Sequence, residues 1–531
     1  MREFIREQIS TVHEQYSVLI DAIAPVRFTK SELAILFVRK IQHDFLLRME
    51  EPRTWYTAFA ALILVAAIVA SQLRARTSSL RRLGLPVVSA PKGAAKFDYR
   101  VILDEGARRY PHSPYLITYS GFEYVVFPPS SWDEIKRIPS TKASTLLFFT
   151  HVFFGGWRLL GSDTSALHKA IGTDLNRALP IRMKAHQESA RKACESTLGS
   201  CPEWKSFRMY FTLQGIIAAT NATGLVGPEL GSNRGWLVAV QAFPMAIVVA
   251  ISTSGLSPRL LRPLVTFFVF LPTWALYWYM RWLLQPIVNR DLREYEIASQ
   301  EKEKSELTQA QPDKKFPMIA WLMSRYTPKE RTPQQVAHDF ILVKRPALVE
   351  ELRTELEEVL VDGLLPQSQL GELKKMDSFM RECSRFNPFG FMALFRRLHT
   401  PVKLSNCPEL PAASNICVDI HTIPWSRELW GNSEEFDPMR FYKLRQLPGR
   451  EQRHQFTSLG PDTPGWGDGP QACPGRAFAG NTLKVTLAHM IMNYEFKLPD
   501  SGSEPKRYSM PNGSMRPDMS VRIMFRERKS S

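Results

Sequence analysis

The stretch Trp466-Gly-Asp-Gly-Pro-Gln-Ala-Cys473-Pro-Gly475 decides how the rest of the chain is interpreted. It places one cysteine between a run of helix-breaking residues and an apolar segment, Phe478 to Phe496, with the composition of a helix. Such punctuation is typical of a tight loop that opens a helix. A thiolate at a helix N-terminus is stabilised by unpaired backbone N–H groups, and nearby glycines allow a flat partner to approach the backbone. These surroundings suit a sulfur ligand of heme iron.

A lone cysteine also has a simpler interpretation, because free cysteine is among the most buried residue types and usually only packs. Zinc is disfavoured, since no second cysteine or histidine stands at ligand spacing around Cys473. The other cysteines show no regular spacing, which favours reduced thiols in a cytosol-facing domain over a disulfide framework. They are Cys194, Cys201, Cys383, Cys407 and Cys417.

The same stretch resembles the heme-binding signature of the cytochrome P-450 superfamily, whose glycines match Gly467, Gly469 and Gly475. The resemblance implies a heme b cofactor whose iron is bound by the Cys473 thiolate, within a loop formed by Trp466 and those three glycines. Two positions depart from the family pattern. Trp466 stands where the family usually has Phe, which is a tolerable aromatic exchange. Gln471 stands where an Arg or His commonly reaches a heme propionate, so this sequence departs from the family at one propionate contact.

Two further segments carry the resemblance. Glu382-Cys-Ser-Arg385 matches the family's Glu-x-x-Arg helix, and Phe436-Asp-Pro-Met-Arg440-Phe441 matches the downstream segment whose arginine completes a buried network. From the residues alone, Glu382 and Arg385 are an ordinary i, i+3 surface pair worth a few tenths of a kcal/mol. The resemblance implies instead that Arg385 and Arg440 share the Glu382 carboxylate and lock two distant segments beneath the heme.

Arg396 is a candidate for the propionate contact. It lies in Phe395-Arg396-Arg397, where the family commonly has an arginine that holds a propionate, and charge-assisted pairing to a carboxylate is physically apt. The sequence does not decide between Arg396 and Arg397. A pair that faces solvent is equally compatible with it.

The composition bounds the class of protein. With 531 residues, of which 44% are hydrophobic, the chain can bury a core and form one large domain or two to three smaller ones. Lys and Arg number 68 against 52 acidic residues, for a formal net charge of +16, which indicates an acidic partner surface such as anionic lipid, nucleic acid or an acidic protein. No basic tract is interleaved with aromatics and no zinc finger or RNP-like motif occurs, so we expect no nucleic-acid partner.

A membrane anchor is predicted at residues 54–73, which contain no charged residue and follow an N-terminal extension, 1–53, without an assigned function. About 20 such residues span a bilayer core of roughly 30 Å. Basic residues follow almost unopposed, so the positive-inside rule places the C-terminal part in the cytosol. We therefore expect a single-pass protein of the endoplasmic reticulum membrane, with a basic, proline-containing linker at 74–91 and a heme-binding catalytic domain at 92–531.

Two later segments, Trp236 to Leu256 and Leu264 to Leu284, are apolar enough to be further membrane spans. Prolines interrupt both, at Pro244 and Pro272. In the resembled family this region forms lid helices that rest on the membrane surface, which suits a lipophilic substrate entering from the bilayer. A multi-span membrane transporter is the alternative from a different class of protein.

The predicted fold class is mainly α with small β-sheets (α+β), as in the cytochrome P-450 fold. Helices are predicted at Val349–Leu360 and Glu372–Phe386, and strands at 402–404, 416–420 and 516–526. The C-terminal segment resembles filamentous-fungal members of the superfamily, which are devoted largely to terpenoids and other secondary metabolites.

The resemblance fails where the distal helix should cross the heme. Its start is recognisable at Thr332, but Lys344-Arg-Pro-Ala already resembles the opening of the following helix. From Pro333 to Pro346 a helix is at most about 18 Å long, whereas crossing a domain takes roughly 30 Å. The family's distal acid and alcohol pair is not found, and a deletion is predicted near 340–344.

Together these features predict a membrane-anchored monooxygenase that hydroxylates or otherwise oxidises a lipophilic small molecule. By resemblance, electrons from NADPH arrive through a membrane-bound reductase at a basic proximal face. The alternative within the same family is a splice or gene-model product that binds heme but is catalytically impaired.

Overall fold

The computed structural model describes residues 62, 66, 79–91, 99–119, 122–153, 176–257, 262–304, 349–386, 388, 390–497, 499, 508–509, 515–516 and 521–528. The predicted N-terminal extension, nearly all of the 54–73 anchor and the predicted deletion near 340–344 lie outside the described residues. The described part is mainly helical and contains sheets of five, three and two strands. This agrees with the predicted class of mainly α with small β-sheets.

The five-stranded sheet has the order β1-β2-β6-β5-β3. Its strands are β1 (Tyr115–Tyr119), β2 (Phe122–Phe127), β3 (Ala143–Ser144), β5 (Met392–Leu398) and β6 (Asn415–Asp419). Strands β2 and β6 are parallel and the other pairs are antiparallel. The alternation of β2 separates two cores, because Val125 and Phe127 pack on one face while Tyr124 and Val126 pack on the other.

Part of the predicted linker belongs to this sheet. After the short 3-10 turn η1 (Ser79–Leu83), the backbone N–H of Val88 donates to the carbonyl oxygen of Leu116, and Leu116 donates to Pro86, both at 2.8 Å. The Val88 side chain is buried. Residues 86–88 therefore pair with β1.

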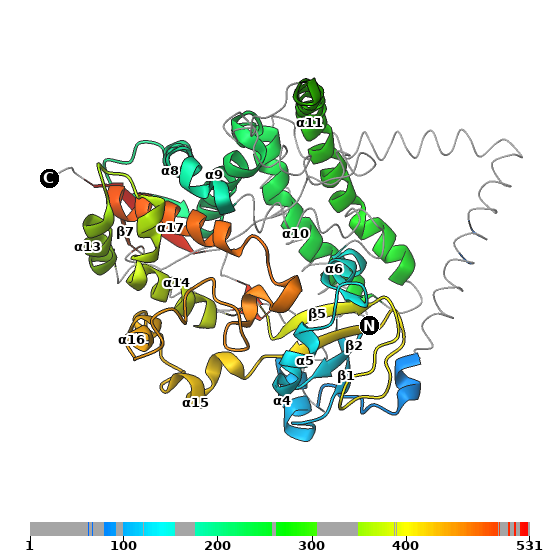
Figure 1. Ribbon diagram of the computed structural model, residues 1–531. Coiled ribbons are helices and arrows are strands. Elements are labelled where there is room, and N and C mark those ends of the chain that lie inside the picture. Colours follow the sequence, from blue (N-terminus) through cyan, green and yellow to red (C-terminus); the bar gives the residue numbers. More distant parts are fainter. Residues whose placement is uncertain are drawn as a thin grey trace, which may run out of the picture.

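The helices that surround the cysteine loop form a separate layer beside this sheet (Figure 1). They are α8 (Asn176–Leu198), α9 (Met209–Gly231), α13 (Val349–Val359), α14 (Lys374–Phe386) and α17 (Arg476–Asn493). The apolar faces of α8, α13, α14 and α17 meet in one buried cluster that includes Leu356, Phe379 and Val485, whereas α9 packs with α8 in a second cluster. The predicted helices at 349–360 and 372–386 correspond to α13 and α14.

The apolar segment predicted as a helix to Phe496 ends three residues earlier. After Asn493 the chain continues as β7 (Tyr494–Lys497), which pairs with β10 (Arg522–Glu527), while β4 (Lys205–Arg208) lies on the other side of β10. Phe496 opposes Phe525 in this sheet. Pairing with a distant strand therefore overrides the helical composition of these last residues.

The remaining elements are short. Helices and 3-10 turns are α4 (Tyr99–Arg109), η2 (Pro129–Ser131), α5 (Trp132–Lys136), α6 (Thr145–Phe153), η5 (Gln367–Gly371), η6 (Ile423–Trp425), α15 (Arg427–Trp430), α16 (Arg440–Arg445), η7 (Pro464–Trp466) and η8 (Gly469–Gln471). A small hairpin joins β8 (Tyr508–Ser509) and β9 (Met515–Arg516). At the predicted strand 402–404, Val402 makes an isolated bridge to Leu410.

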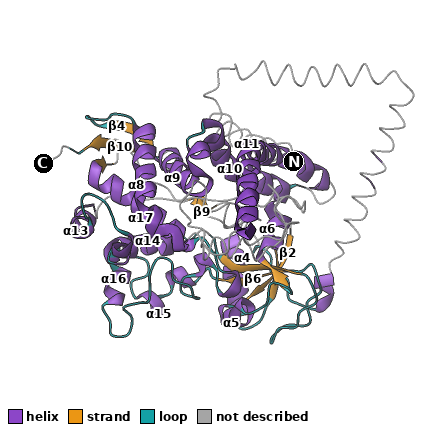
Figure 2. Ribbon diagram, turned by 45° about the horizontal axis from the view of Figure 1, so that its top comes forward, coloured by secondary structure: helices purple, strands orange, loops and turns teal. Residues whose placement is uncertain are grey.

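Two long apolar helices, α10 (Arg234–Leu256) and α11 (Arg262–Lys304), lie side by side in Figures 1 and 2. Among the described residues, one window, Arg234–Ile251, is long and apolar enough to cross a membrane, and 44% of it is buried. Helix α11 differs, because a row of large apolar side chains on it is exposed. These are Leu264, Phe267, Phe268, Leu271, Trp278, Tyr279 and Trp282.

Candidate active site

Cys473 lies in a closed loop directly before α17. Its backbone N–H donates to the carbonyl oxygen of Trp466 at 2.8 Å, which joins the two ends of the loop. Its own carbonyl oxygen accepts from Nη1 of Arg476, the first residue of the 18-residue helix. Cys473 is half-buried and is not in a disulfide. The thiol therefore sits at a helix N-terminus, where the positive end of the helix dipole stabilises a thiolate.

Two of the three predicted glycines are required by the backbone. Gly467 and Gly469 have φ angles of +69° and +67°, a conformation that L side chains rarely adopt. A Cβ at Gly469 would also lie 2.5 Å from the carbonyl oxygen of Lys136, so this glycine lets the loop pack against the end of α5. Gly475 differs, because its φ of −88° is open to any residue and it serves as the N-cap of α17.

Trp466 is held in place by the segment that precedes the loop. Its indole N–H donates to the carbonyl oxygen of Phe456 at 2.7 Å, and the two rings meet edge to face at 5.4 Å. A phenylalanine could make the ring contact but not the hydrogen bond. The exchange at this position therefore adds a link between the loop and the preceding segment.

Glu382, Arg385 and Arg440 form one buried network. The Glu382 carboxylate is fully buried and accepts from Nε and Nη2 of Arg385 at 2.8 and 2.7 Å. It also accepts from Nε of Arg440 at 3.2 Å and from the backbone N–H of Asp437 at 3.0 Å. The pair that the residues alone would place at the surface is therefore inside the protein, as the family resemblance implied.

The two arginines also donate hydrogen bonds to backbone carbonyl oxygens of residues 430–435. Arg385 donates to the carbonyl oxygens of Ser433 and Glu435, and Arg440 donates to those of Trp430, Asn432 and Glu435. Arg385 thus ties this irregular segment to α14, and Arg440 ties it to α16. The arrangement fixes the chain between α15 and α16 from within.

Arg396 and Arg397 have different surroundings. Arg396 is 2% exposed, and its Nη1 donates to the hydroxyl of Thr145 at 2.7 Å. Among the described residues its Nε and Nη2 have no hydrogen-bond partner. Burial disfavours the charged form and lowers the pKa of Arg396 to about 10. Arg397 alternates to the other face, where it donates to the side-chain oxygen of Asn415 at 2.8 Å.

Gln471 is turned toward the first residue of α6 and the segment before it. Its amide oxygen accepts from the backbone N–H of Thr145 at 2.8 Å, and its amide nitrogen donates to the carbonyl oxygen of Ala143 at 2.8 Å. The side chain at the position where the family has Arg or His is therefore engaged by the protein itself.

Sequence reasoning missed two sets of buried charges that hold the loop. Asp377, one turn before Arg381 on α14, accepts from the backbone N–H of Phe456 at 2.8 Å and pairs with Lys484 at 2.7 Å. Arg381 donates to the carbonyl oxygen of Gln455 and to the Asp462 carboxylate, both at 3.0 Å. The available signal in the sequence was the i, i+4 spacing of Asp377 and Arg381 on α14. Two charged residues at this spacing look the same in a sequence whether they are buried or form a surface pair.

Asp468 was also missed, although it lies inside the motif. Its carboxylate accepts from the indole N–H of Trp132 at 2.8 Å and pairs with Lys136 at 3.3 Å. Since both partners are on α5, the cysteine loop is fixed to this helix by a side chain as well as by the close approach at Gly469.

These residues fit a heme group. The half-buried thiol at a helix N-terminus offers an iron ligand, the left-handed glycines keep side chains off the loop, and the unpaired edge of Arg396 is a buried donor pair for a carboxylate. Heme b carries two carboxylates and one iron that can take a thiolate ligand. The donor set therefore suits the iron and one carboxylate of this cofactor.

Comparison with known proteins identifies the family. The sequence model of the family described as "Cytochrome P450" matches residues 340–525. Cytochrome P450 monooxygenase ffsD of Aspergillus flavipes is 39% identical, over 98% of this chain and 100% of that protein. The pyrichalasin C-18 hydroxylase of Pyricularia grisea is 36% identical, over 95% of this chain and 96% of that protein.

A solved structure has the same fold. The retinoic acid bound cyanobacterial CYP120A1 superposes with a TM-score of 0.52, over 84% of this chain and all of that chain, at 14% sequence identity. The likeness in fold agrees with the much closer likeness in sequence to the fungal proteins. The chain therefore belongs to the cytochrome P450 family and is a heme-dependent monooxygenase.

Proposed function

We propose that this protein is a membrane-anchored heme-thiolate monooxygenase that oxidises a lipophilic small molecule of fungal secondary metabolism. The proposed reaction is a hydroxylation. The observation that carries the proposal is the placement of Cys473 in a closed, glycine-dependent loop at the start of α17. A relative of similar length is named as a C-18 hydroxylase, which supports hydroxylation as the reaction type.

The residues of this chain take defined roles in the proposed reaction. Cys473 binds the iron of heme, and heme held by a thiolate supplies the activation of dioxygen. The Trp466 carbonyl and Arg476 hold the cysteine backbone, while Asp377 and Arg381 hold the segment that leads to the loop. Glu382, Arg385 and Arg440 support the neighbouring loop, and Arg396 binds a heme carboxylate.

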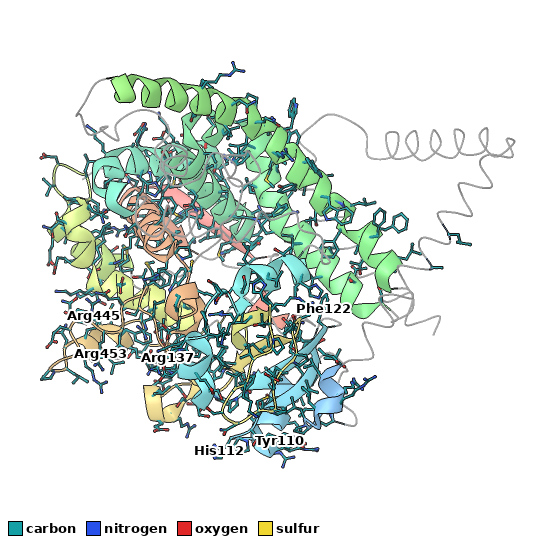
Figure 3. The ribbon with its side chains drawn as sticks, turned by 45° about the vertical axis from the view of Figure 1, so that its right-hand side comes forward. Tyr110, His112, Phe122, Arg137, Arg445 and Arg453 are labelled. Atoms are coloured by element: carbon teal, nitrogen blue, oxygen red, sulfur yellow. The ribbon has the colours of Figure 1, made fainter. Side chains whose placement is uncertain are left out.

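Electrons are proposed to come from NADPH through a reductase that docks on a basic surface. The excess of basic residues supports an acidic partner. Arg137, after α5, and Arg453, in the segment before the loop, are exposed and are labelled in Figure 3. Arg137 directly follows α5, which contacts Asp468 of the cysteine loop. Arg453 lies in the chain segment that leads to this loop. A reductase bound there would approach the thiolate side of the cofactor.

Membrane association is proposed to use two surfaces. Residues 54–73 supply the single-pass anchor in the endoplasmic reticulum membrane, and the exposed apolar row on α11 rests on the bilayer surface. The spacing from Leu264 through Phe268 and Leu271 to Trp278 and Trp282 keeps these side chains on one face of the helix. Substrate would then enter from the lipid rather than from water.

A second candidate is a heme-binding product with impaired catalysis. It is favoured by the short sequence between Pro333 and Pro346, which leaves room for at most about 18 Å of helix. The match to the family model also begins at residue 340, inside this region. Such a protein would retain the cysteine loop but lack the distal acid and alcohol that deliver protons.

Turnover with isotopically labelled dioxygen tests the proposal. The full chain, reconstituted with a reductase, NADPH and a panel of lipophilic terpenoid and polyketide compounds, is expected to give a product heavier by one labelled oxygen atom. The Cys473→Ala variant is the control and should give none. If the full chain binds heme but yields no labelled product while consuming NADPH, the impaired product is the correct function.

A further inference from the structure

Gln471 holds the first residue of α6 and the segment before it through both ends of its amide. Its Oε1 accepts from the backbone N–H of Thr145 at 2.8 Å and from the Thr145 hydroxyl at 3.1 Å. Its Nε2 donates to the carbonyl oxygens of Ala143 at 2.8 Å and Ile138 at 3.4 Å. An arginine could not accept the first pair of hydrogen bonds and a carboxylate could not donate the second pair. The complete set therefore requires an amide at this position.

Thr145 connects Gln471 to Arg396. A hydroxyl has one proton, and here it is donated to Oε1 of Gln471, so the lone pairs of the oxygen accept from Nη1 of Arg396 at 2.7 Å. The same Nη1 donates to the carbonyl oxygen of Phe395 at 2.9 Å. One corner of the guanidinium is thus fixed by two acceptors, and the orientation of the hydroxyl depends on Gln471.

The opposite edge of the Arg396 guanidinium is the one that remains unpaired. Its Nε and Nη2 have no hydrogen-bond partner in the described part of the chain, although the side chain is only 2% exposed. The Nε–H and one Nη2–H point in parallel, and this edge binds a carboxylate through two hydrogen bonds. Leaving both donors unsatisfied in the interior costs free energy. A planar anionic acceptor is therefore the group that this edge suits.

We propose that Thr145 and Gln471 are positioning residues that present the Nε–Nη2 edge of Arg396 to one carboxylate of the bound heme. The inference rests on the heme-thiolate function proposed above. It assigns a role to the position at which this sequence lacks the family's Arg or His. Gln471 contributes to cofactor binding through Thr145 and Arg396, and it does not contact the carboxylate itself.

A double-mutant cycle on the full-length protein tests this role. The variants are Thr145→Val, Thr145→Ser, Arg396→Met and Thr145→Val with Arg396→Met, and the measurement is the rate of heme transfer to excess apomyoglobin. We expect Thr145→Val to raise this rate about tenfold, the effect of one lost charge-assisted hydrogen bond. Thr145→Ser keeps the hydroxyl and should behave as the parent. In the Arg396→Met background, Thr145→Val should add nothing.

Gln471→Met provides a second way to break the network with little change in volume. It removes the acceptor of the Thr145 hydroxyl while Arg396 is left in place, so heme transfer should be faster than in the parent and again non-additive with Arg396→Met. An equal effect of Thr145→Val in both backgrounds, or no effect in either, would overturn the proposal. A Thr145→Ser variant as impaired as Thr145→Val would also overturn it, because packing rather than the hydroxyl would then be responsible.

The spectrum of the reduced protein with carbon monoxide separates failure of this inference from failure of the proposed function. Every variant in the cycle retains Cys473, so each is expected to show the long-wavelength Soret band of thiolate-ligated heme. Absence of this band from the parent contradicts the heme-thiolate function itself. A band that is retained throughout, together with additive effects on heme transfer, contradicts only the role of Thr145 and Gln471.

Discussion

Glu382 and Arg385 form a bidentate ion pair inside the protein, with N–O distances of 2.7 and 2.8 Å, and the Glu382 side chain has no exposed surface. Arg440 shares the same carboxylate from a segment 58 residues away. Removing the carboxylate would leave two buried guanidinium groups without their counter-ion. The network is therefore expected to be much more important for stability than a surface pair of the same spacing.

Replacing Glu382 by Gln should lower the free energy of unfolding by about 3–5 kcal/mol, because it leaves two buried guanidinium cations without their counter-ion. Urea unfolding followed by circular dichroism measures the change. Glu434→Gln is the matched control, since Glu434 pairs with Arg427 at 2.7 Å in the same loop but both side chains are more than half exposed. The control should change stability by no more than about 1 kcal/mol. Equal losses in the two variants would contradict the structural role of Glu382.

A methyl group at Gly469 is expected to damage the cysteine loop, whereas the same change at Gly465 should not. Gly469 has a φ of +67°, and a Cβ there would lie 2.5 Å from the carbonyl oxygen of Lys136. Gly465 has nothing within 4 Å of the corresponding position. Gly469→Ala should cost about 1–3 kcal/mol and reduce the heme content of the purified protein. Heme content equal to that of Gly465→Ala would show that the close approach at Gly469 is unimportant.

His421 should make stability fall as the pH rises. Burial works against the charged form, but the hydrogen bonds and charges of Asp419 and Asp104 outweigh it and raise the pKa of His421 above its usual value. A raised pKa in the folded state stabilises the protein fully below the unfolded pKa of about 6.5, and this contribution is lost as the pH rises through the folded value. The destabilisation caused by His421→Gln should therefore shrink between about pH 6 and pH 9.

His489 provides a control of opposite sign for this measurement. Burial favours the neutral ring and lowers the pKa of His489 in the folded protein. The contribution of this residue to the free energy of unfolding is therefore fully present above the unfolded pKa of about 6.5, and it is lost as the pH falls through the folded pKa. The effect of His489→Gln on the free energy of unfolding should accordingly change at acidic rather than basic pH. Parallel pH profiles for the two variants would contradict the ion pairs assigned to His421.

The exposed row on α11 predicts contact with lipid. In vesicles that contain brominated lipids, part of the tryptophan fluorescence of the full chain should be quenched by bromine near Trp278 and Trp282, which are 52% and 67% exposed. Replacing both by Phe should reduce the quenched fraction. Trp430→Phe is the control, because Trp430 is buried and donates to the carbonyl oxygen of Ile423. A quenched fraction that responds equally to both changes would contradict lipid contact by α11.

The sequence predicted those parts of the fold that are encoded locally. The apolar periodicity of 349–360 and 372–386 was sufficient to predict α13 and α14, because each helix buries one stripe. The end of α17 could not be predicted in the same way. Tyr494 and Phe496 leave the helix to pair with residues about thirty positions later, and no local pattern contains that information.

The site shows the same division between local and distant information. Cys473 and its glycines were recognisable from the motif, and the burial of Glu382 and Arg385 could be expected only from the family resemblance. Gln471 was identified as a departure, but its partners lie 326 residues away at Thr145. Which of Arg396 and Arg397 has the unpaired buried edge depended on the register of β5 around a bulge, which composition does not encode.

The most direct test of the central claim is the spectrum of the reduced full-length protein with carbon monoxide, compared between the parent and Cys473→Ala. The parent is expected to show the long-wavelength Soret band that reports thiolate ligation of heme, and the variant is expected to lack it. A parent without this band, or a band unchanged in Cys473→Ala, would contradict the assignment of Cys473 as the ligand of the heme iron.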